Sequence, residues 1–162
     1  MDHGNEKNRI SGFTPLEVLV VLVIIGIISV IIVGRSDIGQ TDLLAQTEVI
    51  KSHIRYAQSR AMNSDRIWGI RGDASGRLYW LFVEGDPANK KLPGEESDTV
   101  DLATHKLKLT PTETLISFDS RGRPCSDTHG TILRDSDLTL TLAADSGATT
   151  TLSVTRNTGF IP

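Results

Sequence analysis

Hydrophobic positions divide the chain into one continuous apolar run and a longer part in which apolar and polar residues alternate. The run extends from Phe13 to Val33, 21 residues in which Glu17 is the only charged side chain. As a helix it would be about 31 Å long, which matches the hydrocarbon thickness of a bilayer. Lys7 and Arg9 precede the run, so we expect the N-terminus to stay in the cytoplasm.

A second helix is predicted after a short polar segment. Gly34 ends the apolar run, and the polar residues 35–42 predict a bend. We expect the helix to restart with Thr41 or Asp42 as its N-cap. Apolar residues then recur at helical spacing and predict one buried face. They are Leu43, Ile50, Ile54, Ala57 and Ala61.

Beyond residue 64 the pattern changes to the period of two that is typical of half-buried strands. Turn residues separate these stretches, and the charged segment 84–101, with two prolines, is expected to be a loop. The sequence therefore predicts an α+β protein in which a long N-terminal helix packs, by its second half, on a small antiparallel β domain. The expected strands lie in "RIWGIR", "RLYWLFVE", "LISFDSRGRP", "DLTLTLAAD" and "TTTLSVTRNTGFIP", with a hairpin turn at "DSGA".

The single carboxylate of the apolar run has three interpretations. A secretory signal peptide would need a small-residue cleavage site, which "VGRSD" fits poorly. A plain transmembrane anchor explains the length but not a charge in hydrocarbon, which is costly unless it is paired or near the interface. In the third interpretation the chain is cut after Gly12, so that Phe13 gains a free amine four positions before Glu17. The amine of one subunit could then pair with the carboxylate of its neighbour and set the axial register of packed helices.

The stretch "GFTPLEVLVVLVIIGII" resembles the type IV prepilin signature, G-F-T-L-[IV]-E followed by an apolar helix. The resemblance implies cleavage between Gly12 and Phe13 by a membrane-embedded aspartic prepilin peptidase, N-methylation of Phe13, and an assembly role for Glu17. Pro15 departs from the signature, where the residue is usually aliphatic. Proline is tolerated in the first turn of a helix because its missing N–H would be unpaired there anyway.

The remaining segments resemble the GspH/FimT class of minor pseudopilins and minor pilins. They are "IKSHIRYAQSRAMNSD", "ISFDSRGRP" and the terminal "RNTGFIP". The resemblance implies a type IV pilin-like fold with a β domain of two sheets. It also implies four segments: a leader peptide (1–12), a transmembrane and filament-core helix (13–35), an amphipathic helix (36–64) and a periplasmic β domain (65–162).

The function implied by the resemblance is structural. The chain would be a minor pseudopilin or minor pilin of a type II secretion pseudopilus or a type IV pilus, placed at or near the filament tip. Its partners would be other pilins or pseudopilins in a hetero-oligomeric filament, together with the prepilin peptidase and methyltransferase. Before assembly it would cross the bacterial inner membrane once, with its C-terminal domain in the periplasm.

Charge and composition weaken the alternative of a pilus-linked DNA-binding protein for DNA uptake. The net charge is −3 and aromatic residues make up 5%, which argues against nucleic acid as a partner. The candidate contacts are Arg121 and Arg123 in "SRGRP", joined by Arg134 and Arg156. Turn chemistry alone accounts for the glycine and proline of "SRGRP". The basic residues of the second helix are expected to form a solvent-exposed face: Lys51, Arg55 and Arg60.

Catalytic and metal-binding signals are weak. "CSDTHG" crowds Cys125, Asp127 and His129 into one loop, whereas catalytic triads are assembled from separate parts of a fold. We therefore expect no enzyme, and we expect Cys125 to be a turn or core residue, an intersubunit disulfide being the alternative. The histidines are scattered and the acidic segment 84–101 lacks EF-hand spacing, so we expect no metal and no cofactor.

Overall fold

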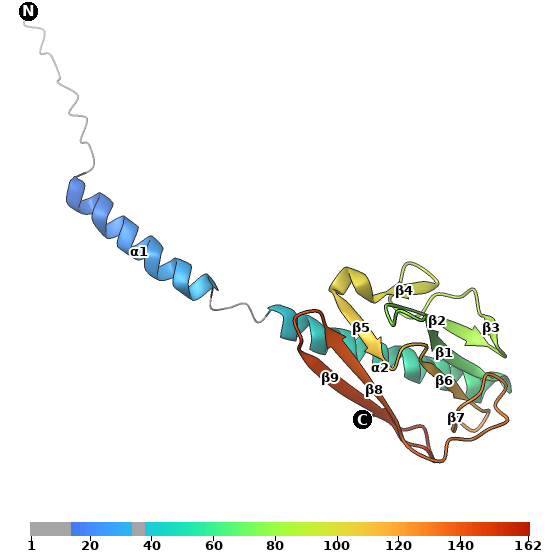
Figure 1. Cartoon of the computed structure of the whole chain (residues 1–162). Helices are drawn as coiled ribbons and strands as arrows, with labels where there is room; N and C mark the ends of the chain where they lie inside the picture. The colour runs from blue at the N-terminus through green and yellow to red at the C-terminus, as the bar shows by residue number, and fades with distance from the viewer. Residues whose placement is uncertain (1–13, 34–37) are drawn as a thin grey trace, which may run out of the picture. The chain divides into compact units, whose positions relative to one another are not determined.

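The computed structural model describes residues 14–33 and 38–162 (Figure 1). Helix α1 (Pro15–Val33) and the part from Ile38 onward are separate units, each described by itself. Gly12, Phe13 and the bend expected after Gly34 lie outside the described residues. The second unit has the α+β architecture predicted from the sequence, with one helix, α2 (Ile38–Ser64), and two antiparallel sheets.

The buried face of α2 is the one that the helical spacing predicts. All five apolar positions from Leu43 to Ala61 are at most 4% exposed. The N-cap prediction was wrong, because α2 begins at Ile38, before Thr41 and Asp42. Asp42 Oδ2 instead lies 3.4 Å from Nδ1 of His105.

The basic residues of α2 are not simply a solvated face: Arg55 is exposed as predicted but also contacts the β domain, and the prediction was wrong for Arg60, which is half-buried. Arg55 donates from Nη2 to the carbonyl of Ile161 at 2.8 Å. The guanidinium of Arg60 lies 4.6 Å from the ring centroid of Trp68, as in a cation–π contact. Both side chains therefore bind the β domain to the helix, a role that periodicity alone does not reveal.

The first sheet has the order β3-β2-β1-β6-β7, and β4 pairs with β2 beside β3. The second sheet has the order β5-β8-β9, and every pairing in both sheets is antiparallel. The strand bounds are β1 (Trp68–Gly72), β2 (Leu78–Val83), β3 (Asp86–Pro87), β4 (Thr99–Asp101), β5 (Leu107–Thr110), β6 (Leu115–Phe118), β7 (Pro124–Cys125), β8 (Leu138–Ala144) and β9 (Thr149–Val154), with a 3-10 turn at Leu102–His105.

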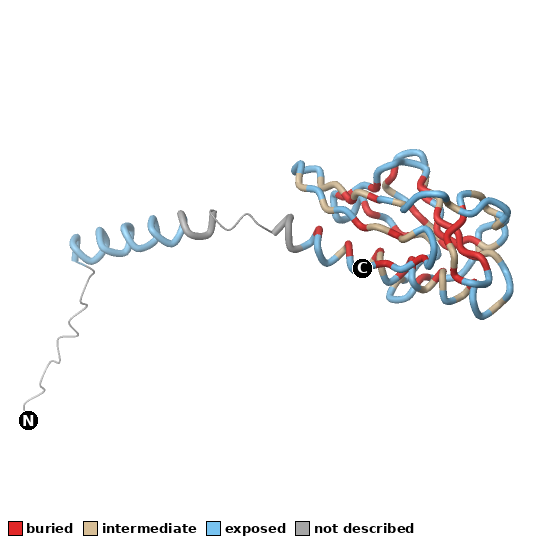
Figure 2. Tube along the Cα trace, turned by 90° about the horizontal axis from the view of Figure 1, so that it is seen from below, coloured by how far each residue is buried: buried red, intermediate tan, exposed pale blue. Residues whose placement is uncertain are grey.

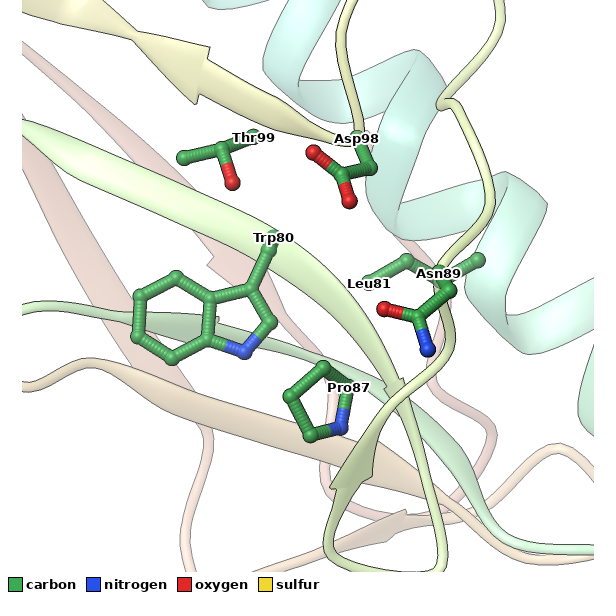
Figure 3. A pocket seen from close by; sticks show the side chains of 6 residues that line it. All are labelled: Trp80, Leu81, Pro87, Asn89, Asp98 and Thr99. Carbon is green, nitrogen blue, oxygen red and sulfur yellow. The ribbon is translucent and has the colours of Figure 1, made fainter.

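The segment 84–101 is more ordered than the loop expected from its charge. It contains β3 and β4, and β4 places Val100 opposite Tyr79, where Val100 is only 6% exposed. The same pairing puts Thr99 opposite Trp80 (Figure 3). A single apolar residue among charged neighbours gives no periodicity, so these short strands form through pairing with β2 rather than through local propensity.

The core of the second unit lies between α2 and the two sheets (Figure 2). The helix packs against β1 and β6 of the first sheet and against β8 and β9 of the second. Ala57 and Ala61 are fully buried, and such small side chains let the helix approach the sheets closely. At Gly69 of β1 the neighbouring strands leave no room for a side chain, because a Cβ there would lie 2.6 Å from the ring of Phe82 and would meet the carbonyl of Ile116.

Candidate functional site

The start of α1 is built by Thr14. The backbone N–H of Glu17 donates to Thr14 Oγ1 at 3.2 Å and to the carbonyl of Thr14 at 3.0 Å. Thr14 is therefore the N-cap, Pro15 the first helical residue and Glu17 the third, which is the Thr-x-x-Glu pattern of a capping box. The proline that departs from the prepilin signature occupies the helix position that proline favours.

This geometry gives Glu17 a local role. A carboxylate in the first turn of a helix is stabilised by the partial positive charge of the helix N-terminus. Glu17 is exposed, so its carboxylate is open to a partner in another molecule. The two roles are compatible, because a carboxylate in the first turn of α1 can interact with the helix N-terminus and remain open to a partner in another molecule.

The surface of α1 is apolar on every side. From Leu16 to Ile28 all large hydrophobic side chains are exposed, between 47% and 72%. The only hydroxyl of α1, on Ser29, donates to the carbonyl of Ile25 at 2.7 Å and so is satisfied within the helix. A helix that is apolar all round is stable only when lipid or other helices cover it. By length and hydropathy together, none of the helices in the described residues qualifies as a membrane span.

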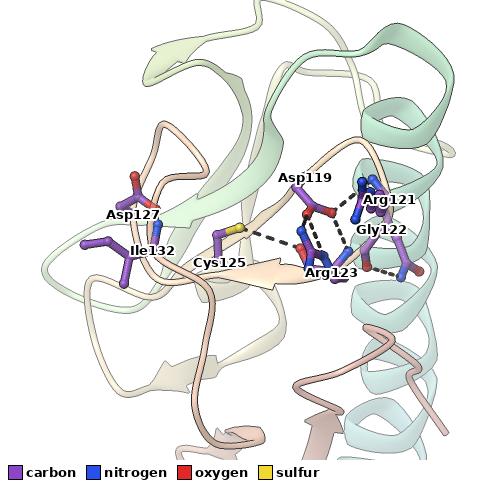
Figure 4. Close-up of polar contacts among 8 residues, drawn as sticks. Asp119, Arg121, Gly122, Arg123, Cys125, Asp127 and Ile132 are labelled. Carbon is purple, nitrogen blue, oxygen red and sulfur yellow. Dashed lines mark hydrogen bonds and ion pairs between the residues drawn. The ribbon is translucent and has the colours of Figure 1, made fainter.

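The second group of sequence-predicted residues forms a turn after β6 (Figure 4). Asp119 Oδ1 accepts hydrogen bonds from the backbone N–H groups of Arg121 (3.0 Å) and Arg123 (2.8 Å). Its other oxygen, Oδ2, pairs with Nε (2.8 Å) and Nη2 (2.7 Å) of Arg123. Gly122, at φ 77°, provides the left-handed residue that the turn requires.

Of the four arginines considered as DNA contacts, three have side chains that are engaged within the chain, whereas Arg121 is bound only through its backbone N–H and its side chain is exposed. The charge of Arg123 is neutralised by Asp119, so it offers little to a phosphate. Arg134 donates from Nη2 to the carbonyl of Leu115 at 2.7 Å, and burial lowers its pKa. Arg156 donates from Nη1 to the carbonyl of Asp135 at 2.6 Å. These interactions account for Arg123, Arg134 and Arg156 without nucleic acid, and the turn accounts for the backbone of Arg121.

Gln58 of α2 connects this turn to the C-terminal segment. Its Nε2 donates to the carbonyls of Gly122 (2.8 Å), Thr158 (3.0 Å) and Gly159 (3.2 Å). One side chain of the helix thus holds the two "G"-containing turns that carry the sequence resemblance to minor pilins. Their glycines are structural, since both have positive φ and lie against Gln58.

The "CSDTHG" loop is organised around one carboxylate. Burial would raise the pKa of Asp127, but hydrogen bonds from the backbone N–H groups of Ile132, Thr131 and His129 and from the Thr131 hydroxyl outweigh it and lower the pKa to about 2. Cys125 is 0% exposed, and burial, followed by the charges of Asp119 and Asp127, raises its pKa to about 11. A buried thiol of that pKa is a poor nucleophile, and its position confirms the prediction of a core residue.

Sequence reasoning missed the role of one histidine. His53 is fully buried, with Nε2 2.9 Å from the carbonyl of Pro93 and Nδ1 2.8 Å from the hydroxyl of Tyr79. A carbonyl only accepts, so Nε2 carries the proton and Nδ1 accepts from Tyr79. Burial lowers the pKa of His53, although Pro93 and the nearby Glu95 oppose the shift. The sequence did indicate that His53 would be buried, because it lies on the apolar face of α2.

Comparison with known proteins adds two findings and one negative result. The family described as the prokaryotic N-terminal methylation motif matches residues 7–33. The type IV minor pilin FimU of Pseudomonas aeruginosa is 17% identical with a TM-score of 0.53, and the alignment covers 76% of this chain and 88% of that chain. The minor pseudopilin EpsH of the Vibrio cholerae type 2 secretion system is 15% identical with a TM-score of 0.47, covering 73% and 90%. No curated protein sequence matches the chain. The chain therefore carries an N-terminal methylation motif at residues 7–33 and shares its fold with FimU.

Proposed function

We propose that the chain is a minor pilin or minor pseudopilin, a structural subunit that is inserted into a type IV pilus or a type II secretion pseudopilus. The observation that carries the proposal is α1, whose apolar side chains are exposed on every side and which lies within the N-terminal methylation motif. Such a helix needs lipid before assembly and neighbouring helices afterwards. The second unit, with its own core, remains outside the apolar phase and contacts adjacent subunits.

The proposed processing follows from the order of residues at the N-terminus. Prepilin peptidase cleaves between Gly12 and Phe13, and the new amine of Phe13 is methylated. Thr14 and Pro15 then start the helix directly, so that Glu17 is fixed in its first turn. The amine of one subunit pairs with the Glu17 carboxylate of a neighbour. Because an unpaired charge in hydrocarbon is costly, only the register that brings the two together is stable.

The proposed location is the bacterial inner membrane, with the part from Ile38 onward in the periplasm. Lys7 and Arg9 precede the apolar run and favour a cytoplasmic N-terminus. The partners are other pilins or pseudopilins, and a minor subunit of this kind belongs at or near the tip of the filament.

The test is to replace Glu17 with glutamine in the full chain and to measure its incorporation into filaments. Glu17→Gln keeps the size and the helix position but removes the charge, so we expect normal cleavage and methylation with a strong loss of incorporation. Glu48→Gln is the matched control, because Glu48 is an exposed carboxylate of α2. N-terminal mass spectrometry verifies processing in both variants. Normal incorporation of Glu17→Gln, or a leader still present on wild-type subunits in filaments, would contradict the proposal.

A further inference from the structure

A pocket of about 240 Å³ opens on the first sheet, away from the residues that the proposed function uses. It lies where β2, the segment after β3 and the start of β4 meet. Its lining combines one large aromatic ring with three polar side chains (Figure 3): Trp80, Leu81, Pro87, Asn89, Asp98 and Thr99.

The apolar wall of the pocket is the indole of Trp80. Its neighbours Tyr79 and Leu81 are buried in the core, so the alternation of β2 places Trp80 on the opposite face of the sheet. Trp80 is only half-buried, and Pro87 lies beside it. A flat aromatic face with an apolar neighbour favours a ligand that presents a flat, apolar C–H face of its own.

The polar wall carries both acceptors and donors. Figure 3 shows the Asp98 carboxylate, the Thr99 hydroxyl and the Asn89 carboxamide arranged around the space next to the indole. Of these, the Asp98 carboxylate is 3.4 Å from the hydroxyl of Ser97, a long contact that leaves most of its acceptor capacity free. A carboxylate accepts, whereas a carboxamide and a hydroxyl both donate and accept.

The backbone holds these groups in place. Asn89 is in the left-handed region at φ 48°, which asparagine tolerates better than most residues. Just before it, the N–H of Ala88 donates to the carbonyl of Leu81 at 3.0 Å and ties the segment to β2. Thr99 is fixed by its pairing with Trp80. The pocket is therefore preformed, which reduces the entropic cost of binding.

We propose that this pocket binds one pyranose ring of a carbohydrate. A pyranose stacks its C–H face on an aromatic ring while adjacent hydroxyls donate to a carboxylate and exchange hydrogen bonds with amide and hydroxyl groups. A small organic cation would suit Trp80 and Asp98 as well. Arg71, however, lies directly opposite Trp80 on β1 and brings a positive charge to the same face, which favours a neutral ligand.

The proposal is tested by NMR with the full chain in a polyoxyethylene detergent, which has neither a sugar nor an ammonium headgroup. The chain has two tryptophans, so its two indole N–H signals report on Trp80 and on Trp68, which lies under Arg60. The probes are methyl glucoside, methyl galactoside, methyl mannoside and N-acetylglucosamine at millimolar concentration, with tetramethylammonium chloride in parallel. We expect at least one sugar to shift the Trp80 signal in a saturable way and to leave Trp68 unchanged.

Three variants separate the pocket from a general surface effect. Asp98→Ala should weaken sugar binding, followed by the Trp80 signal, roughly tenfold or more, the loss expected when a charged hydrogen-bond acceptor is removed. Trp80→Ala removes the stacking face and the reporting indole together, so its binding is followed on the sugar by saturation-transfer NMR, and a similar loss is expected. Glu96→Ala is the matched control, an exposed carboxylate of the same segment that does not line this pocket, and it should bind normally. If no sugar shifts Trp80, if only the ammonium salt does, or if Asp98→Ala binds as tightly as wild type, the proposal is wrong.

Discussion

At the scale of single residues, Asp119 shows how much one carboxylate can organise. Its two oxygens accept from two backbone N–H groups and from the guanidinium of Arg123. Gly122 and Pro124 predicted the turn from the sequence, but nothing in the sequence predicted that the Asp119 carboxylate stabilises it. Aspartate before a turn is common, and only the folded chain shows that Asp119 binds the backbone N–H groups of Arg121 and Arg123 and the guanidinium of Arg123.

We expect Asp119→Ala to reduce the free energy of unfolding by about 2–4 kcal/mol. The substitution leaves two backbone donors and a partly buried guanidinium without their acceptor, and each unmade hydrogen bond costs about 1–3 kcal/mol. Denaturant-induced unfolding measures the change. Asp135→Ala is the control: this exposed residue takes part in the Arg156 contact only through its backbone carbonyl, so its replacement should have little effect. Equal stability of the two variants would contradict the role given to Asp119.

At the scale of elements, periodicity predicted what is long and regular. The buried face of α2 and the strands β2, β8 and β9 follow the apolar spacing, and the hairpin turn at 145–148 joins β8 to β9 as expected. The missed elements are short. β5 has four residues and β4 has three, and both exist because a longer strand pairs with them. The predicted start of α2 was wrong: the helix begins at Ile38, and Asp42, a residue that favours N-caps, lies inside it and contacts His105.

The close packing of Gly69 in β1 against Phe82 in β2 and Ile116 in β6 gives a prediction at the scale of elements. Gly69→Ala should destabilise the protein by about 1–3 kcal/mol, the usual cost of overpacking, because the added methyl group would press on the Phe82 ring and the Ile116 carbonyl. Gly72→Ala, in the same strand, is the control, since a Cβ there meets nothing closer than 3.4 Å. Thermal unfolding of both variants compares the two positions. An unchanged melting temperature for Gly69→Ala would show that β1 can move away from Phe82.

At the scale of the whole molecule, a site can be predicted from the sequence when its residues lie close together along the chain. The prepilin motif lies within one short stretch, so the sequence alone predicted its residues. The pocket beside Trp80 is assembled from β2, the segment after β3 and the start of β4, which no linear motif joins. His53 is similar: it joins α2 to Tyr79 of β2 and to Pro93, and only the fold brings these together.

The buried His53 makes the stability of the second unit depend on pH. Its pKa in the folded chain is below the ordinary value, so on acidification the unfolded chain takes up the proton first. The free energy of unfolding should therefore fall as the pH drops through about 6.5, the ordinary histidine value, until the folded form also protonates. The facing groups are Tyr79, the Pro93 carbonyl and Glu95, whose carboxylate is 3.8 Å away.

Denaturant unfolding at a series of pH values checks this prediction. His53→Gln should be less stable near neutral pH but should lose less stability on acidification, because it lacks the titrating ring. Ser52→Ala is the control, since Ser52 is an exposed residue of α2 without a titrating side chain, and its pH profile should match that of the wild type. The contribution of Asp127 appears only at more acidic pH, where its folded pKa of about 2 lies below the ordinary aspartate value. A pH profile of His53→Gln parallel to that of the wild type would contradict the assignment.

The amide of Gln58 is a position where slow chemical damage would change the structure. Glutamine side chains hydrolyse slowly to glutamate, and here the product would turn an acid toward the three carbonyl oxygens that the amide now binds. Two turns far apart in the chain would be released by the same chemical event. That change would loosen the C-terminal segment, and an increase of one mass unit at Gln58 would be its signature.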